Sequence, residues 1–159
     1  ALGNAAALER WPTPGQETVT GGTPRYAIYR TRDGRHLAAA PLEEKFWDVF
    51  TRVIDLPEAL RDDARDPAAT RAAVAARIAA REAAEWREAF AGKDVCCSIV
   101  RDLREALADP HWAAREVFAR MSRMGDARVA ALPSIVAPAL RDGAVADHAP
   151  ALGEANAHW

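Results

Sequence analysis

The sequence of 159 residues has few cysteines and no long apolar run. Its only cysteines are Cys96 and Cys97, and adjacent cysteines rarely bond each other, so we exclude a disulfide scaffold and favour a reducing, cytoplasmic compartment. No stretch approaches the roughly 20 apolar residues of a membrane span, and the first residues do not show the charged-then-apolar pattern of a signal peptide. We therefore expect a cytoplasmic protein without a membrane partner, in which the cysteine pair is a buried strand residue and its neighbour.

An excess of basic charge is also absent. Lys and Arg contribute 21 residues against 23 Asp and Glu, which gives a net charge of −2. Nucleic-acid binding needs Lys and Arg concentrated on one surface, so we expect no nucleic-acid partner. The four histidines are too scattered to supply the ligands of a structural zinc site, and we expect no metal. They are His36, His111, His148 and His158.

Large apolar side chains are scarce relative to the hydrophobic total. Half of the chain is hydrophobic, but 38 residues are alanine, so the larger apolar residues suffice for one compact domain and are few for two. The alanine-rich helix predicted over 68–81 has only Val74 and Ile78 as large apolar residues, after a capping Asp66 and an N1 proline. We interpret the acidic segment 62–66 before it as a solvated connector.

The pattern of apolar residues predicts an α+β fold. Alternation over 26–30 and 36–40 around Asp33-Gly34 predicts a β-hairpin with a two-residue type I′ turn. A short apolar run over 94–100 predicts a third antiparallel strand. We expect four to six helices around these strands and irregular arms at both ends. The helical signals lie at 5–10, 42–54, 57–60, 68–81, 82–91, 102–108 and 111–120, and a weaker hairpin signal at 121–132.

Few residues offer chemistry by their pattern alone. Glu43 and Glu44 follow the returning strand at the start of a predicted helix, where a carboxylate is either an ordinary helix cap or a strand-end base. The Gly21-Gly22 loop precedes a strand rather than a helix, so it lacks the geometry of a nucleotide-binding glycine loop. It is either a plain turn or a loop whose backbone approaches a ligand. Ser98 and Ser134 lack the sequence context of a catalytic nucleophile.

Several segments, in order, resemble the small domain of family III CoA-transferases, and most closely its alpha-methylacyl-CoA racemase branch. The similar segments are Gly21–Thr31, Asp33-Gly34, Ala40–Trp47, Trp86 with Phe90, Asp94–Val100, Ala108–His111 with Arg115, and Pro150–Glu154. The resemblance implies a small domain at 25–132, a linker from a missing large domain at 1–24 and a return linker or tail at 133–159. It also implies two chains interlocked as a homodimer.

The resemblance gives roles to the residues that the pattern alone left open. Leu42-Glu43-Glu44-Lys45-Phe46 is similar to the racemase segment whose glutamate is one of two acid/base groups around the α-carbon of an acyl-CoA, so Glu43 is the implied catalytic residue. Gly21 and Gly22 correspond to the loop that closes over the coenzyme A thioester. The implied substrate is an acyl-CoA, and no cofactor is tightly bound.

Other functions remain open beside the racemase interpretation. Within the family, the chain could belong to a CoA-transferase that moves CoA from an acyl-CoA to a carboxylate, with Glu43 structural. From another class, it could be a non-catalytic dimerisation or regulatory module. In every case we expect this chain alone to be inactive, because the segments that resemble the family include no part of its large domain.

Overall fold

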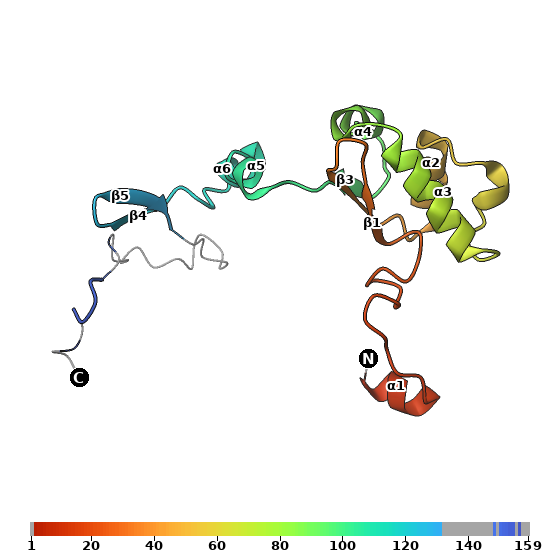
Figure 1. Cartoon of the computed structure of the whole chain (residues 1–159), viewed down its shortest axis with the longest axis horizontal. Helices are drawn as coiled ribbons and strands as arrows, with labels where there is room; N and C mark the ends of the chain where they lie inside the picture. Colours follow the sequence, from red (N-terminus) through yellow and green to blue (C-terminus); the bar gives the residue numbers. More distant parts are fainter. Residues whose placement is uncertain (1, 132–147, 149, 155, 157–159) are drawn as a thin grey trace. The chain divides into compact units, whose positions relative to one another are not determined.

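A computed structural model describes residues 2–131, 148, 150–154 and 156 (Figure 1). They divide into two units, Ala1–Val100 and Arg101–Trp159, which we describe one after the other. None of the helices in this part of the chain is long and apolar enough to cross a membrane.

The first unit contains a three-stranded antiparallel sheet with the strand order β1-β2-β3. The strands are β1 (Ala27–Arg30), β2 (His36–Ala39) and β3 (Cys97–Ile99). Ala38 in the central strand lies opposite Ile28 on one side and Ser98 on the other. The hairpin and the antiparallel third strand confirm the predicted α+β class.

The two faces of this sheet differ in burial. Tyr29, Leu37 and Ile99 are buried, whereas Ile28, beside Tyr29 in β1, is 68% exposed. Successive strand residues point to opposite faces, so this alternation places the core on one side of the sheet and leaves the other side open. Helices α3 and α4 lie on the core side, α3 against β1 and α4 against β3.

The helices of the first unit begin and end where local signals predict, within a few residues. They are α1 (Leu2–Leu8), α2 (Glu44–Val53), the 3-10 helix η1 (Glu58–Leu60), α3 (Pro67–Ala79) and α4 (Ala83–Phe90). The Asp66 carboxylate accepts a hydrogen bond from the Ala69 amide at 2.9 Å, which confirms the predicted cap of α3. The first helix begins three residues earlier than predicted and ends two residues earlier, because the chain leaves the helix at Glu9, where φ is 50°.

A row of aromatic rings joins α2 and α4 in the core. Ring centroids lie 5.8 Å apart between Trp47 and Phe50, 5.8 Å between Phe50 and Phe90, and 5.5 Å between Phe90 and Trp86. Both tryptophans are 1% exposed, so they belong to the core. The aromatic rings supply buried apolar area that the many alanines do not, because one aromatic ring buries far more apolar area than one methyl group.

The hairpin turn differs from the predicted two-residue type I′ turn. Only Gly34 of the Asp33-Gly34 pair has a positive φ, 79°, and its amide donates to the Thr31 carbonyl at 2.9 Å. The Asp33 carboxylate accepts hydrogen bonds from the Thr31 hydroxyl at 2.5 Å and from the Ala83 amide at 3.2 Å. The hydrogen bond from Thr31 is the main cause that lowers the pKa of Asp33. These bonds hold Asp33 in a longer turn that also attaches the hairpin to the start of α4.

The second unit contains two short helices and a hairpin. Its elements are α5 (Leu103–Leu107), α6 (Pro110–Ala114), β4 (Met121–Met124) and β5 (Ala127–Ala130). Asp102 and Glu105 form a capping box at the start of α5, which lies within the predicted helical segment 102–108. Helix α6 is shorter than the predicted 111–120, because the backbone turns to a φ of 53° at Glu116.

Candidate functional site

Glu43 lies at the junction between β2 and α2. Its backbone is extended, with φ −78° and ψ 144°, and its carbonyl accepts hydrogen bonds from the Phe46 and Trp47 amides at 3.0 Å each. Its side chain is exposed and makes no capping hydrogen bond to α2. The capping explanation therefore does not apply to Glu43, although the residue occupies the N-cap position.

Arg25 connects the segment before β1 with both neighbours of Glu43. One guanidinium nitrogen, Nη1, donates to the Leu42 carbonyl at 3.2 Å. The other, Nη2, forms ion pairs of 2.8 Å with Glu44 Oε1 and with Asp63 Oδ1. Burial lowers the pKa of Arg25, but the hydrogen bonds to Asp63 and Glu44 outweigh burial and hold this pKa above its usual value.

The Arg25 cluster was not predicted from the sequence. Asp63 was interpreted as part of a solvated connector, yet its side chain is only 13% exposed and accepts from Arg25 Nε at 2.9 Å as well. The guanidinium also lies over the Trp47 ring, 5.0 Å from the centroid. Arg25 and Asp63 are 38 residues apart in the sequence, and no local sequence pattern links them. The sequence gives only two indications of this cluster: Arg25 follows a proline, and Asp63 belongs to an acidic pair in the connector.

The Gly21-Gly22 loop needs glycine for its own folding. Gly21 has a φ of 108°, and a Cβ on Gly22 would lie 2.0 Å from the Gln16 carbonyl oxygen. The Gly22 amide donates to the Glu17 carbonyl at 2.9 Å, which closes the loop. From α3, the Arg71 guanidinium donates a hydrogen bond to the Gly21 carbonyl. The loop is thus folded back on itself and attached to α3.

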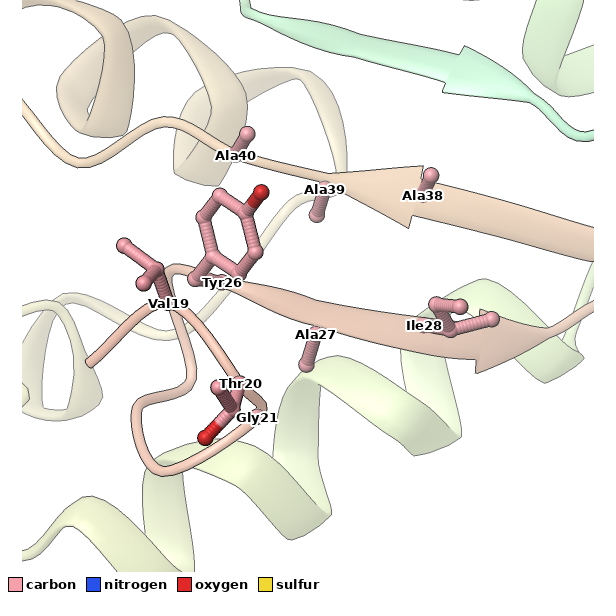
Figure 2. Close-up of a pocket in the computed structure, with 9 residues that line it drawn as sticks. All are labelled: Val19, Thr20, Gly21, Tyr26, Ala27, Ile28, Ala38, Ala39 and Ala40. Carbon is pink, nitrogen blue, oxygen red and sulfur yellow. The ribbon is translucent and has the colours of Figure 1, made fainter. Parts of the chain in front are cut away.

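A pocket of about 500 Å³ lies beside this loop on the hairpin (Figure 2). It is lined by Val19, Thr20, Gly21, Tyr26, Ala27, Ile28, Ala38, Ala39 and Ala40. Figure 2 shows the Tyr26 ring between the loop segment of Val19 and Ala40, the residue directly after β2. Its walls are mostly apolar, so the pocket can accept an apolar or weakly polar part of a ligand.

The structure brings the predicted residues near one another only in part. Gly21 lines the pocket, and Gly22 lines a second hollow, of about 530 Å³, against α3. Glu43 is absent from both linings, but it follows Ala40 by three residues in the connection between β2 and α2. The pocket and Glu43 are therefore neighbours along one segment rather than members of one enclosed cavity.

The cysteines offer little chemistry. Cys96 is exposed and has a φ of 45°, and β3 begins only at Cys97, so the predicted strand is too long at its start. Burial raises the pKa of the half-buried Cys97 thiol to about 12, and the neighbouring Cys96 adds to the shift. A thiol with that pKa is protonated and unreactive near neutral pH. In the described part of the chain, no group of three or more His, Cys, Asp or Glu side chains is placed to hold a metal ion.

Comparison with known proteins gives one consistent family. Residues 2–156 match the family model described as CoA-transferase family III. The chain is 27% identical over 117 residues to the alpha-methylacyl-CoA racemase of Homo sapiens, covering 70% of this chain and 30% of that protein. It is 30% identical over 114 residues to the alpha-methylacyl-CoA racemase of Mus musculus, covering 68% of this chain and 29% of that protein.

Solved structures share the fold. A mutant of Rv3272 from Mycobacterium tuberculosis aligns over 99% of this chain and 43% of its own, with a TM-score of 0.62 and 16% identity. The orthorhombic form of Rv3272 aligns over 98% of this chain and 44% of its own, with the same TM-score and identity. This chain therefore spans less than half of these structures and about 30% of the curated relatives.

Proposed function

The chain belongs to CoA-transferase family III, and from this premise we propose that it is the small-domain part of an acyl-CoA racemase. The observation that supports this proposal best is the position and exposure of the Glu43 carboxylate. It lies in the connection between β2 and α2, directly before α2 begins, and its exposed carboxylate makes no capping hydrogen bond to that helix. A carboxylate in that state can exchange protons with a substrate.

The chemistry that we propose for Glu43 is a proton transfer at the α-carbon of an acyl-CoA. The Glu43 carboxylate removes the α-proton from one face, and the electron pair of the broken C–H bond delocalises into the thioester as an enolate. A second acid/base group then donates a proton to the opposite face of the α-carbon, which inverts the configuration. In the reverse direction, protonated Glu43 is the donor. Two-sided transfer needs a group within hydrogen-bond reach on each face, so Glu43 supplies one of the two.

We propose that the Gly21-Gly22 loop and the adjoining pocket bind part of the coenzyme A thioester. One feature supports this assignment: Gly21 lines a pocket with mostly apolar walls. The pocket lies along the segment that leads to Glu43. A thioester bound over the loop would direct its acyl group along the same segment.

The rest of the site is expected outside this chain. We propose residues 1–24 as a linker from a large domain, 25–132 as the small domain, and 133–159 as a return linker or tail. The large domain would supply the second acid/base group and most of the coenzyme A site, and two full-length chains would interlock as a homodimer. The short coverage of the relatives supports this division, because this chain spans about 30% of their length. We therefore expect this chain alone to show no turnover.

The assay that tests the proposal uses the full-length protein that contains this chain. A single enantiomer of a 2-methylacyl-CoA is incubated with and without a carboxylate acceptor, and both racemisation and CoA transfer are followed. Racemisation that needs no acceptor supports the proposal. Transfer that needs the acceptor, without racemisation, would contradict it in favour of a family CoA-transferase. Neither reaction in a correctly folded protein would favour a non-catalytic dimerisation or regulatory module.

A further inference from the structure

The Arg25 side chain contacts both residues that flank Glu43. Its Nη1 lies 3.2 Å from the Leu42 carbonyl oxygen, and its Nη2 lies 2.8 Å from Glu44 Oε1. We propose that Arg25 is a positioning residue that holds the Leu42 backbone and the Glu44 side chain, on either side of Glu43, and so sets the reach of the Glu43 carboxylate. This inference rests on the acid/base role proposed for Glu43.

Arg25 is itself held firmly enough to act in this way. Its Nε and Nη2 both donate to Asp63 Oδ1, at 2.9 and 2.8 Å, and both side chains are 13% exposed. The guanidinium lies over the Trp47 ring, whose Nε1 donates to the Arg61 carbonyl at 2.6 Å. A planar guanidinium with five donors can satisfy a carboxylate, a carbonyl and a second carboxylate at once, and charge-assisted bonds of this kind are strong. Lysine has no such fork.

Glu43 depends on its backbone for its position. Its side chain makes no capping hydrogen bond, and its carbonyl is fixed only by the amides of the first turn of α2. The residues on either side, Leu42 and Glu44, are the two that Arg25 contacts. A change at Arg25 would therefore move the Glu43 carboxylate without touching it. Displacing a reacting group by about 1 Å can cost on the order of 100-fold in rate.

Arg32 provides a matched control. It is also an arginine with two carboxylate partners, Glu82 and Glu85, each at 3.1 Å, and it donates to the Ala80 carbonyl at 3.4 Å. These partners belong to the end of α3 and the start of α4, away in sequence from residues 42–44. Arg32→Met thus removes two ion pairs, as Arg25→Met does, without loosening the segment that contains Glu43, although the Arg32 side chain is 54% exposed and that of Arg25 only 13%.

The test compares the two enantiomers of a 2-methylacyl-CoA in the full-length protein. Proton removal from each is followed by ¹H NMR in D₂O, and Glu43→Gln first identifies the enantiomer whose proton Glu43 removes. We expect Arg25→Met to lower kcat for that enantiomer roughly tenfold, with KM changed less than about twofold. The rate for the other enantiomer should stay within about twofold of wild type. Arg32→Met should leave both rates within that range, and Arg25→Lys should fall between wild type and Arg25→Met.

The outcomes distinguish the acid/base role of Glu43 from the positioning role of Arg25. If Glu43→Gln keeps the wild-type rate for both enantiomers, the acid/base role of Glu43 fails. If Glu43→Gln is impaired but Arg25→Met lowers both enantiomers equally, or no more than Arg32→Met, the positioning role alone fails. Should Arg25→Met not fold by circular dichroism, Glu44→Gln removes one contact and leaves the Asp63 pair intact. Wild-type rates in both Glu44→Gln and Arg25→Lys would then overturn the inference.

Discussion

Replacing Phe50 with alanine should remove much of the stability of the first unit. Phe50 is 0% exposed and stacks between Trp47 and Phe90, with centroids 5.8 Å away on both sides. Truncation of a buried phenylalanine to alanine costs about 3–5 kcal/mol, because apolar area is lost and a cavity remains. Phe50→Leu keeps most of the volume but loses two aromatic pairs of about 0.5–1.5 kcal/mol each, so we expect a loss of about 1–3 kcal/mol. Small domains are stable by only about 5–15 kcal/mol.

Urea unfolding followed by tryptophan fluorescence measures these changes. Ile28→Ala is the control, because Ile28 is 68% exposed on the open face of the sheet and its truncation should change the free energy of unfolding by less than about 0.5 kcal/mol. The midpoint should shift for both Phe50 variants while the m-value stays constant. A loss below about 1 kcal/mol for Phe50→Ala would refute the placement of Phe50 in the core, and an equal loss for Ile28→Ala would refute the placement of Ile28 on the open face of the sheet.

Three further outcomes are expected from local features. At pH 8 iodoacetamide should modify the exposed Cys96 much faster than Cys97, because the pKa of the Cys97 thiol is raised to about 12. Mass spectrometry of timed samples measures both modification rates, and equal rates would contradict this prediction. The lowered pKa of Asp33 means that its carboxylate stabilises the fold above about pH 4 and that this contribution is lost as the pH falls through the folded-state pKa. The urea midpoint of Asp33→Asn should therefore fall less than that of wild type between about pH 5 and pH 3, and identical pH profiles would contradict the assignment. Gly22→Ala should lower the melting temperature, because its Cβ would meet backbone 2.0 Å away, whereas Gly3→Ala, with nothing within 4 Å, should not lower it.

Features that a few neighbouring residues determine could be predicted from the sequence. The cap of α3 depends on Asp66, Pro67 and an amide three residues further on, and it was predicted correctly. The same holds for the buried side chains of Val74 and Ile78 on α3, because helical periodicity is a local property.

Features that depend on distant partners could not be predicted. The Asp33-Gly34 turn was assigned to a type I′ turn, but a hydrogen bond from the Ala83 amide, 50 residues away, contributes to the conformation that Asp33 adopts. Asp63 was assigned to solvent, although it binds Arg25 across 38 residues. For the site, the sequence pointed to Glu43 through its resemblance to a family. Whether its carboxylate caps α2 depends on the side-chain conformation at the first turn, which no sequence pattern fixes.

The acid/base role of Glu43 is tested most directly by measuring racemisation and α-proton exchange of each enantiomer with Glu43→Gln in the full-length protein. Glu58→Gln, another exposed glutamate of the first unit, is the control. If Glu43 is one of two acid/base groups, its loss should slow racemisation in both directions by at least about 100-fold. The α-proton of one enantiomer should still exchange with D₂O without inversion, through the group that remains. Wild-type racemisation in Glu43→Gln would contradict the account, and so would an equal loss of proton exchange from both enantiomers.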